Sequence, residues 1–202
     1  LPPDRHCVVF QKFHSLPRSP SQNGILWISY CVLLAIKILK DHGYSDGDIK
    51  RSNIMMMHNE DPSPSNGPIV CIDFGASQQI GSVPKEGTAV YSMGLPCSCS
   101  TWYDRVCLAS TIIDLATGKP LQDPEQTPAA ILLYLHGKTA KFHHTSLYEL
   151  VSNSEWKPLC YFLRDLLNPD CTVEMTLDNF PKIWSCSTEA QFVIPHSLQQ
   201  FI

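Results

Sequence analysis

The fold is decided by the stretch Gly47–Asn53, which reads GDIKRSN, taken together with Ile72–Gly75, which reads IDFG. The first segment places an Asp, a Lys two residues later and an Asn three residues after that, which fits a short loop whose polar groups converge on one point. Asp73 follows an apolar run that reads as a strand, and Gly75 is free to adopt the backbone angles of a sharp exit from it. The two segments together predict one polar site built by a loop and a strand end.

Two acidic groups, an amide and a lysine in this order and spacing are the set that phosphoryl transfer from ATP uses. The segments resemble the catalytic loop (residues 46–53) and the metal-binding Asp-Phe-Gly motif (residues 73–75) of the protein kinase family. Taken alone, each of these polar residues is more often structural, as a turn former. The joint spacing, with an apolar strand before the second motif, makes coincidence a weak explanation.

The resemblance implies a role for each polar side chain of the two segments. Asp48 would orient the attacking hydroxyl or accept its proton, and Lys50 would lie near the transferred phosphate and stabilise its charge. Asn53 and Asp73 would hold Mg²⁺, which prefers hard oxygen ligands and bridges the phosphates of ATP. Met55 falls where the family places an apolar floor beneath adenine, although a Met there is otherwise an ordinary core residue. Together with Lys50, these three residues would bind the nucleotide.

Further matches extend the resemblance over roughly residues 7–186. The segment Gly87–Tyr91, GTAVY, resembles the end of a kinase activation segment (residues 76–96), in which Thr88 would contact the catalytic Asp and Lys. Asp104 opens an apolar stretch that resembles the long central helix of the family and closes with Thr-Gly. In the family this aspartate bonds the backbone of the catalytic loop, which implies a positioning role, whereas the plain alternative is an ordinary helix N-cap.

The chain also departs from the family pattern at defined positions. The His-Arg that precedes the catalytic aspartate is replaced by Asp46 and Gly47, so activation by a phosphate docking on that arginine is not expected. The family closes its activation segment with Ala-Pro-Glu, whose Glu pairs with an Arg. Here Met93–Leu95 and Glu174 hold these places, so both partners are absent. Losing both avoids leaving one buried charge unpaired.

The sequence contains no Gly-x-Gly-x-x-Gly loop, no Val-Ala-Ile-Lys strand and no helix with a pairing Glu, the elements that cover ATP in the family. We therefore expect residues 1–14 to be the end of the small lobe and the hinge, and residues 15–202 to be a kinase-like C-terminal lobe. The small lobe would be largely absent. The expected fold class is mainly α with short β-strands.

The apolar patterns predict helices and short strands along most of the chain. A helix at Asn23–Asp41 is apolar nearly all round, which is typical of a buried helix, and a second strongly apolar helix covers Tyr103–Ala116. The segment Gln78–Thr101 has no periodicity. Weaker helices are expected at Pro128–His136, Ser146–Val151, Trp156–Leu167 and Leu177–Trp184, and strands at Cys7–Phe13, Ile54–Met57 and Ile69–Ile72.

Composition excludes several classes of protein. Hydrophobic residues make up 44% and charged residues 17% of the 202 residues, which is globular rather than disordered. The net charge of −4 gives no case for binding nucleic acid or an anionic membrane. The apolar run Ile25–Leu39 is too short to span a bilayer, and no signal-peptide pattern opens the chain. Nine scattered cysteines without a zinc spacing favour a reduced intracellular protein, cytoplasmic or nuclear.

The leading hypothesis is a divergent Ser/Thr protein kinase that transfers the γ-phosphoryl group of Mg-ATP to protein substrates. Ser/Thr rather than Tyr rests on Lys50 and on Thr88. Drift around an intact set of polar residues favours a fast-evolving source such as a virus. A pseudokinase, which acts as a non-catalytic interaction or regulatory module, is the first alternative. A small-molecule phosphotransferase is the second, favoured only by the Gly-Asp pair at residues 47 and 48.

Overall fold

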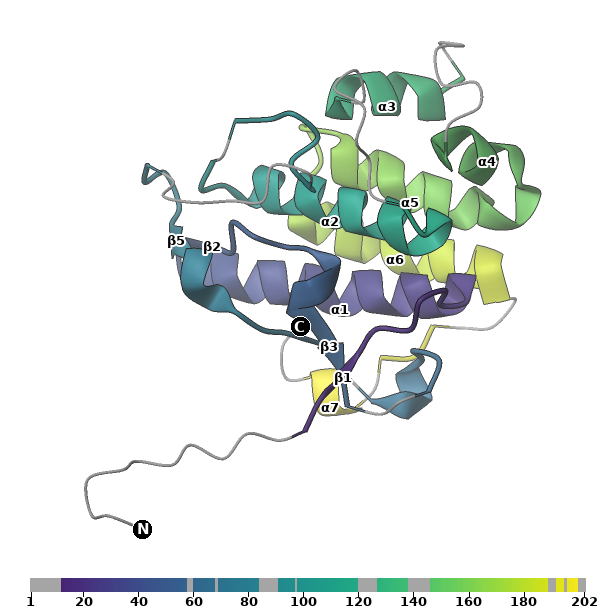
Figure 1. The fold of residues 1–202 in the computed structure, drawn as a ribbon, viewed down its shortest axis with the longest axis horizontal. Coiled ribbons are helices and arrows are strands. Elements are labelled where there is room, and N and C mark those ends of the chain that lie inside the picture. Colours follow the sequence, from purple (N-terminus) through teal and green to yellow (C-terminus); the bar gives the residue numbers. More distant parts are fainter. Residues whose placement is uncertain are drawn as a thin grey trace.

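The computed structural model describes residues 12–57, 60–67, 69–83, 91–96, 98–119, 127–137, 146–188, 192–194 and 196–199. Helices dominate, and the strands are short and antiparallel (Figure 1), as expected from the sequence. The helices are α1 (Gln22–Asp41), α2 (Thr101–Thr117), α3 (Pro128–Leu135), α4 (Ser146–Ser152), α5 (Lys157–Leu167), α6 (Val173–Thr188) and α7 (His196–Gln199). The strands are β1 (His14–Ser15), β2 (Tyr44–Ser45), β3 (Ile54–Met56), β4 (Ile69–Cys71) and β5 (Gln78–Gln79), and short 3₁₀ turns lie at Arg51–Asn53, Pro64–Asn66, Phe74–Ala76 and Ser154–Trp156.

Helix α1 is the centre of the core. It begins at Ser21, whose hydroxyl accepts the N–H of Gly24 at 3.0 Å, and the chain leaves it through Gly43 at φ +80°. The whole helix is long and apolar enough to cross a membrane, which the shorter apolar run alone is not. However, 67% of its apolar window is buried inside the structure, as in the core helix of a folded domain. The expectation of a buried helix is confirmed.

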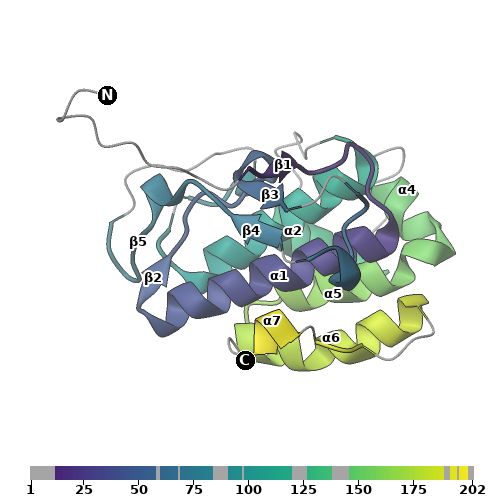
Figure 2. The ribbon, with the colours of Figure 1, turned by 90° about the horizontal axis from the view of Figure 1, so that it is seen from below.

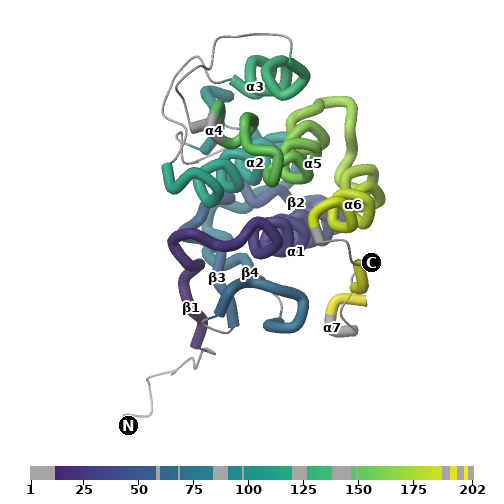
Figure 3. Tube along the Cα trace, turned by 90° about the vertical axis from the view of Figure 1, so that its right-hand side faces the viewer, coloured from purple at the N-terminus to yellow at the C-terminus, as the bar shows by residue number. Residues whose placement is uncertain are grey.

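Four helices, α1 among them, contact one another in a closed ring and enclose the core between them. Helix α1 packs against α2 and α6, and α5 contacts both α2 and α6. Figure 3 shows these four helices side by side. An aromatic cluster fills the junction of α1 and α6, because Tyr30 lies 4.8 Å from Phe180 and 4.9 Å from Phe192, measured between ring centroids. Since burying a large aromatic side chain contributes a few kcal/mol, this junction is a major source of stability.

The strands lie on a different side of α1 from α6 (Figure 2). One sheet has the order β1-β3-β4 and the other pairs β2 with β5. In β3 the side chains of Ile54 and Met56 are buried, whereas Met55 is half-buried and lies opposite Val70 of β4. Because successive residues of a strand face opposite sides, Met55 and Val70 share the outer face of this sheet.

Several element boundaries differ from the sequence expectation. Residues 7–11 of the expected first strand lie outside the described residues, and Lys12 and Phe13 are not in a strand. Helix α6 begins four residues before the expected Leu177, because Thr172 accepts the N–H of Met175 through its hydroxyl at 3.2 Å and acts as an N-cap. The helix also continues past its internal Pro181. The irregular segment after Asp73 contributes the short strand β5, which has no sequence pattern of its own.

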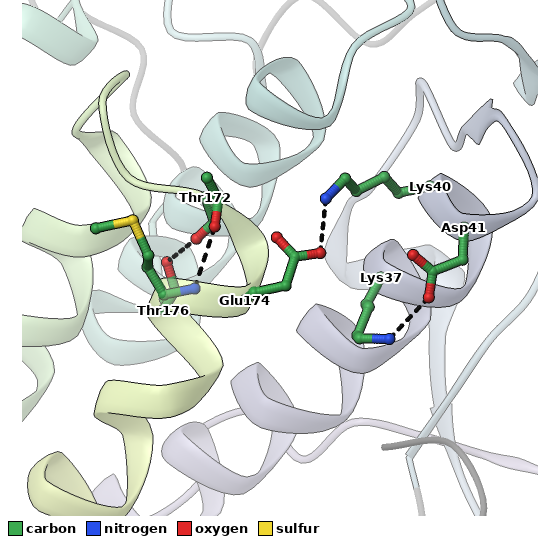
Figure 4. A network of polar contacts seen from close by, with 7 residues as sticks. Lys37, Lys40, Asp41, Thr172, Glu174 and Thr176 are labelled. Carbon is green, nitrogen blue, oxygen red and sulfur yellow. Dashed lines mark hydrogen bonds and ion pairs between the residues drawn. The ribbon is translucent and has the colours of Figure 1, made fainter.

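An ion pair joins the end of α1 to the start of α6. Lys40 Nζ lies 2.6 Å from Oε1 of Glu174, next to a second pair between Lys37 and Asp41 on α1 (Figure 4). The hydrogen bond from Lys40 lowers the pKa of Glu174 to about 2. Glu174 stands where the family resemblance calls for an arginine, and in this structure its charge is used to fasten α6 to α1.

We expect Glu174→Gln to lower the free energy of unfolding at neutral pH by about 0.2–1 kcal/mol, because both partners of the pair are partly exposed. The pKa of Glu174 is depressed in the folded state, so its contribution is present above the ordinary value of 4.5 and is lost as the pH falls toward about 2. Urea denaturation at pH 7 and pH 3 should therefore show a difference between variant and wild type that shrinks at the lower pH. Asp178→Asn, which removes an exposed charge from the same helix, is the control, and an equal loss in both variants would contradict the assignment.

Candidate functional site

The two polar segments singled out in the sequence are brought together by backbone pairing. Strand β2 pairs with β5, with Tyr44 opposite Gln79 and Ser45 opposite Gln78. In addition, the N–H of Ile72 donates to the carbonyl of Asn53 at 2.9 Å. The loop at residues 46–53 and the segment at residues 72–77 are thus held beside each other at both ends, as the sequence predicts.

Asp104 of α2 holds the loop in place. Its Oδ2 accepts the Ser45 hydroxyl and the Asp46 N–H, both at 2.9 Å, and its Oδ1 accepts the Gly47 N–H at 2.9 Å. The side chain is completely buried, and this burial raises the pKa of Asp104 to about 6 against the lowering effect of the three hydrogen bonds. The expected contact between Asp104 and the loop backbone is confirmed. The N-cap interpretation is wrong, because Ser100 caps α2.

A glycine is needed at position 47 for a structural reason that the sequence alone does not reveal. Its φ is +80°, and a Cβ atom at this position would lie 3.2 Å from the carbonyl oxygen of Ala76. A side chain is therefore disfavoured by both the backbone angle and the close approach of the second segment. In the sequence, Gly47 appears as the loss of an arginine and as part of the Gly-Asp pair, whereas in the structure it allows residues 46–53 and 72–77 to approach each other closely.

The polar side chains of the loop converge as expected. Lys50 Nζ lies 2.6 Å from Asp48 Oδ2, and Asn53 Nδ2 donates to Asp48 through the backbone carbonyl at 3.1 Å and through Oδ2 at 3.3 Å. Asn53 Oδ1, the atom able to bind a metal, accepts a long 3.4 Å hydrogen bond from Ser52. The loop thus presents a carboxylate, an ammonium group and an amide within a few ångströms of one another.

Asp73 has an unusual backbone and an open side chain. Its φ of 61° and ψ of 64° lie in the left-handed region, which is strained for a residue other than glycine. A Cβ on Gly75 would lie 3.3 Å from Asp73 Oδ1, so the glycine leaves room for this carboxylate. Asp73 is exposed and, within the residues that the structure describes, its side chain forms no hydrogen bond or ion pair. Strain of this kind marks functional positions.

The electrostatics of the site show that its carboxylates act on one another. Burial is the main cause that raises the pKa of Asp46 to about 7, and the negative charges of Asp104, Asp48 and Asp73 contribute to this rise. A hydrogen bond from the Asp48 N–H to Asp46 Oδ1 at 3.1 Å opposes it. The carboxylates of the two segments thus act on one another, and Lys50 is the cation that pairs with Asp48.

The other expected site residues are less well defined. Thr88 and the rest of Gly87–Tyr91, apart from Tyr91, lie outside the described residues. Met55 lies on the outer face of the β1-β3-β4 sheet, directly after the loop, with Val70 beside it. Among the described residues, no group of three or more His, Cys, Asp or Glu side chains has the geometry of a metal site. The pair Asn53 and Asp73 remains a predicted set of ligands.

Arg105 is a buried cation, and the sequence analysis did not predict its burial. It is only 2% exposed, and its guanidinium donates to the carbonyls of Asp165 at 3.1 Å and Asn168 at 3.3 Å. It ties α2, which carries Asp104, to the end of α5. The signal in the sequence is a single basic residue inside an apolar helical run, and burial lowers the pKa of Arg105.

Comparison with known proteins adds nothing to this geometry. No model of a protein family matches the chain, and no curated protein is similar to it. The function is therefore argued from the residues themselves.

We expect Gly47→Ala to destabilise the protein more than Gly118→Ala. Both glycines have a positive φ, so both variants carry a strain of about 1–2 kcal/mol. Only at residue 47 does the new methyl group also meet a backbone oxygen, because no atom lies within 4 Å of the position at Gly118. Thermal or urea unfolding of the two variants measures the difference. Equal losses would show that the two segments can move apart without penalty.

We expect Asp46→Asn to change how stability depends on pH. The pKa of Asp46 is raised from 3.8 to about 7 in the folded state, so the native protein binds more protons than the unfolded chain in this window. Its contribution to stability is therefore fully present below about pH 4 and is lost as the pH rises to about 7. The asparagine variant should gain about 1–4 kcal/mol relative to wild type between these limits, as measured by chemical denaturation at pH 4.5 and 8. Asp170→Asn, on an exposed turn, should show no such gain, and a flat difference for Asp46→Asn would contradict the burial argument.

Proposed function

We propose that this chain is a divergent protein kinase that transfers the γ-phosphoryl group of Mg-ATP to Ser or Thr hydroxyl groups of protein substrates. The observation that carries the proposal is the convergence of Asp48, Lys50 and Asn53 in one loop, fastened beside Asp73 by β2–β5 pairing and by Gly47. Phosphoryl transfer depends on positioning and charge more than on covalent chemistry. A rigid loop that presents these groups together supports that reaction.

Each residue of the loop has a role in this proposal. The Asp48 carboxylate would accept a hydrogen bond from the substrate hydroxyl, orient it and take its proton. The ammonium group of Lys50, which lies 2.6 Å from that carboxylate, would stay close enough to neutralise charge on the transferred phosphate. The anchor at Asp104 would keep both groups in place, since it holds the backbone of residues 45–47.

The site also fits the magnesium ion that the reaction needs. Asp73 has an exposed carboxylate without a protein partner in the described part of the chain, and Asn53 has an amide oxygen held only by the long bond from Ser52. Mg²⁺ is commonly bound by one or two protein oxygens, with water and phosphate oxygens completing its shell. When bound, it would offset the charge of the phosphates. The carboxylates of Asp48 and Asp73, which both act on Asp46, are negative groups that support a cation here.

A surface for the adenine ring follows from the sheet. Met55 comes two residues after Asn53, and its side chain shares the outer face of the sheet with Val70. This half-buried apolar face adjoins the polar loop, so one ligand with an apolar ring and a charged tail could contact both. We infer that Met55 contributes to nucleotide binding, and that the fold is a kinase-like C-terminal lobe with its nucleotide face open.

The second candidate, a pseudokinase that binds partners without transferring phosphate, is favoured by a different observation. Phe74, next to the proposed metal ligand, is 46% exposed, so an apolar ring at the site lies uncovered in this structure. Such a surface suits an interaction module as well as an enzyme that is completed by a further segment. The Gly-Asp pair that favoured a small-molecule phosphotransferase has a packing explanation in the contact between Gly47 and Ala76.

We expect the protein to transfer ³²P from labelled ATP to a generic protein substrate, and Asp73→Ala to reduce this transfer by at least about 100-fold, because it removes a metal ligand. Asp48→Asn should have an effect of similar size, since it removes the base. Asp178→Ala, an exposed position on α6, is the control for general damage.

The outcomes separate the hypotheses. Undiminished transfer by Asp73→Ala would overturn the metal assignment. Binding of Mg-ATP by the wild type that depends on Asp73, without transfer to any substrate, would favour the pseudokinase. Absence of both binding and transfer would contradict the proposed function.

A further inference from the structure

A cavity of 510 Å³ lies far from the loop at residues 46–53, in the angle between α3, α5 and α6. Figure 3 shows α3 above α5, with α6 beside α5. A second cavity of 590 Å³ adjoins it, because Tyr161 and Cys186 line both. The first is large enough for a few residues of a peptide, and the two share part of their lining. None of the residues assigned to phosphoryl transfer lines either cavity.

The charges of the first cavity are unbalanced. Arg164 and Lys182 line it together with His136, whereas Asp165 is the single carboxylate among the lining residues. Asn179 Nδ2 donates to Asp165 Oδ2 at 3.2 Å, and this hydrogen bond leaves the charge of the carboxylate in place. The lining therefore carries one more cation than carboxylates, although the chain as a whole has a net charge of −4.

Arg164 is held in the wall of the first cavity. One of its terminal nitrogens donates to the carbonyl of Leu135 at the end of α3, and its guanidinium lies over the ring of Tyr161, 5.1 Å from the centroid. These contacts fix the side chain. Its Nε atom is buried, so a ligand in the cavity would meet the terminal nitrogens rather than Nε. Hydrogen bonds from such charged nitrogens to a carboxylate are among the stronger ones in proteins.

Apolar side chains complete the walls of the cavity. Leu132 of α3 and Ile183 of α6 line it together with the ring of Tyr161, which is 39% exposed. A free anion such as phosphate would leave these walls uncovered. A peptide segment with an acidic and an apolar side chain in succession would satisfy both the cations and the apolar walls.

We propose that the pocket between α3, α5 and α6 binds a partner protein through a short segment that carries an acidic side chain next to an apolar one. Arg164 and Lys182 bind the carboxylate, and Leu132 and Ile183 contact the apolar side chain. The site does not depend on the proposed phosphoryl transfer, because its residues and its test are separate from that activity.

Cys186 offers a direct test, since it is a free, exposed thiol on the rim of the pocket. The probes are two blocked tripeptides, one of cysteine, leucine and glutamate and one with glutamine in place of glutamate. Each is supplied as its symmetrical disulfide and equilibrated with the whole protein in the presence of 2-mercaptoethanol, so that the Cys186 thiolate attacks the probe disulfide and releases one peptide as a thiol. The mixed disulfide at Cys186 is measured by mass spectrometry. Cys186→Ser shows which label comes from this position.

We expect the glutamate peptide to label Cys186 roughly tenfold more than the glutamine peptide, which corresponds to one charge-assisted hydrogen bond. Lys182→Gln should reduce this preference, and Arg164→Gln should remove it. Lys119→Gln, an exposed lysine after α2, should keep it. Lys182 is exposed, so its variant folds even if loss of the Leu135 contact destabilises Arg164→Gln.

Equal labelling by the two peptides, or no labelling by either, would overturn the proposal. A third probe, the symmetrical disulfide of 3-mercaptopropionate, carries the carboxylate without a peptide. If it labels Cys186 as strongly as the glutamate peptide, the pocket is a site for small anions and the peptide assignment is wrong.

Discussion

The buried carboxylate of Asp104, which accepts three hydrogen bonds from residues 45–47, is the interaction on which the candidate site depends. These donors belong to a loop with little regular structure, so without Asp104 they would be buried and unsatisfied at about 1–3 kcal/mol each. Asp104 is itself held by α2, which is buried along most of its length and is tied to α5 through Arg105. The position of Asp48 is thus set by the helical core rather than by the loop itself.

The same arrangement explains why the site combines rigid and strained parts. The loop at residues 46–53 is fixed to α2, and Gly47 brings it against Ala76. Across this contact, Asp73 has a left-handed backbone conformation, which costs more for any residue with a side chain than for glycine. Burial and mutual repulsion among the carboxylates raise the pKa of Asp46 to about 7. The local structure therefore gives up some stability in order to gather negative charge at one place, as functional sites commonly do.

Much of this could be predicted from the sequence. Helices α1 and α2 can be recognised in the sequence by their dense apolar residues. The spacing of the two motifs also predicts that Asn53 and Asp73 lie close together. What could not be predicted has no local signal. Strands β2 and β5 are two residues long, and the Lys40–Glu174 pair joins residues 134 positions apart. The reason for Gly47 also depends on a distant residue, Ala76, which no single-sequence pattern can place.

Only some of the contacts that the kinase resemblance implies can be compared with the structure. The bond from Asp104 to the loop backbone was expected and is present, whereas Thr88 cannot be judged because it lies outside the described residues. Glu174, which stands where the resemblance calls for an arginine, instead pairs with Lys40 and fastens α6 to α1. What the structure shows is a mainly helical fold with short strands, in which the residues 46–53 and 72–77 lie beside each other.

The packing of α1 against α6 has a consequence for the synthesis of the protein. Tyr30 and Trp27 of α1 belong to the aromatic junction with Phe180 of α6, yet the ribosome makes α6 more than a hundred residues later. At ordinary translation speeds of about 5–20 residues per second, α1 is complete roughly 7–26 s before synthesis of α6 begins. Until then, the surface that α1 buries against α6 is exposed, and we expect molecular chaperones to bind the nascent chain there.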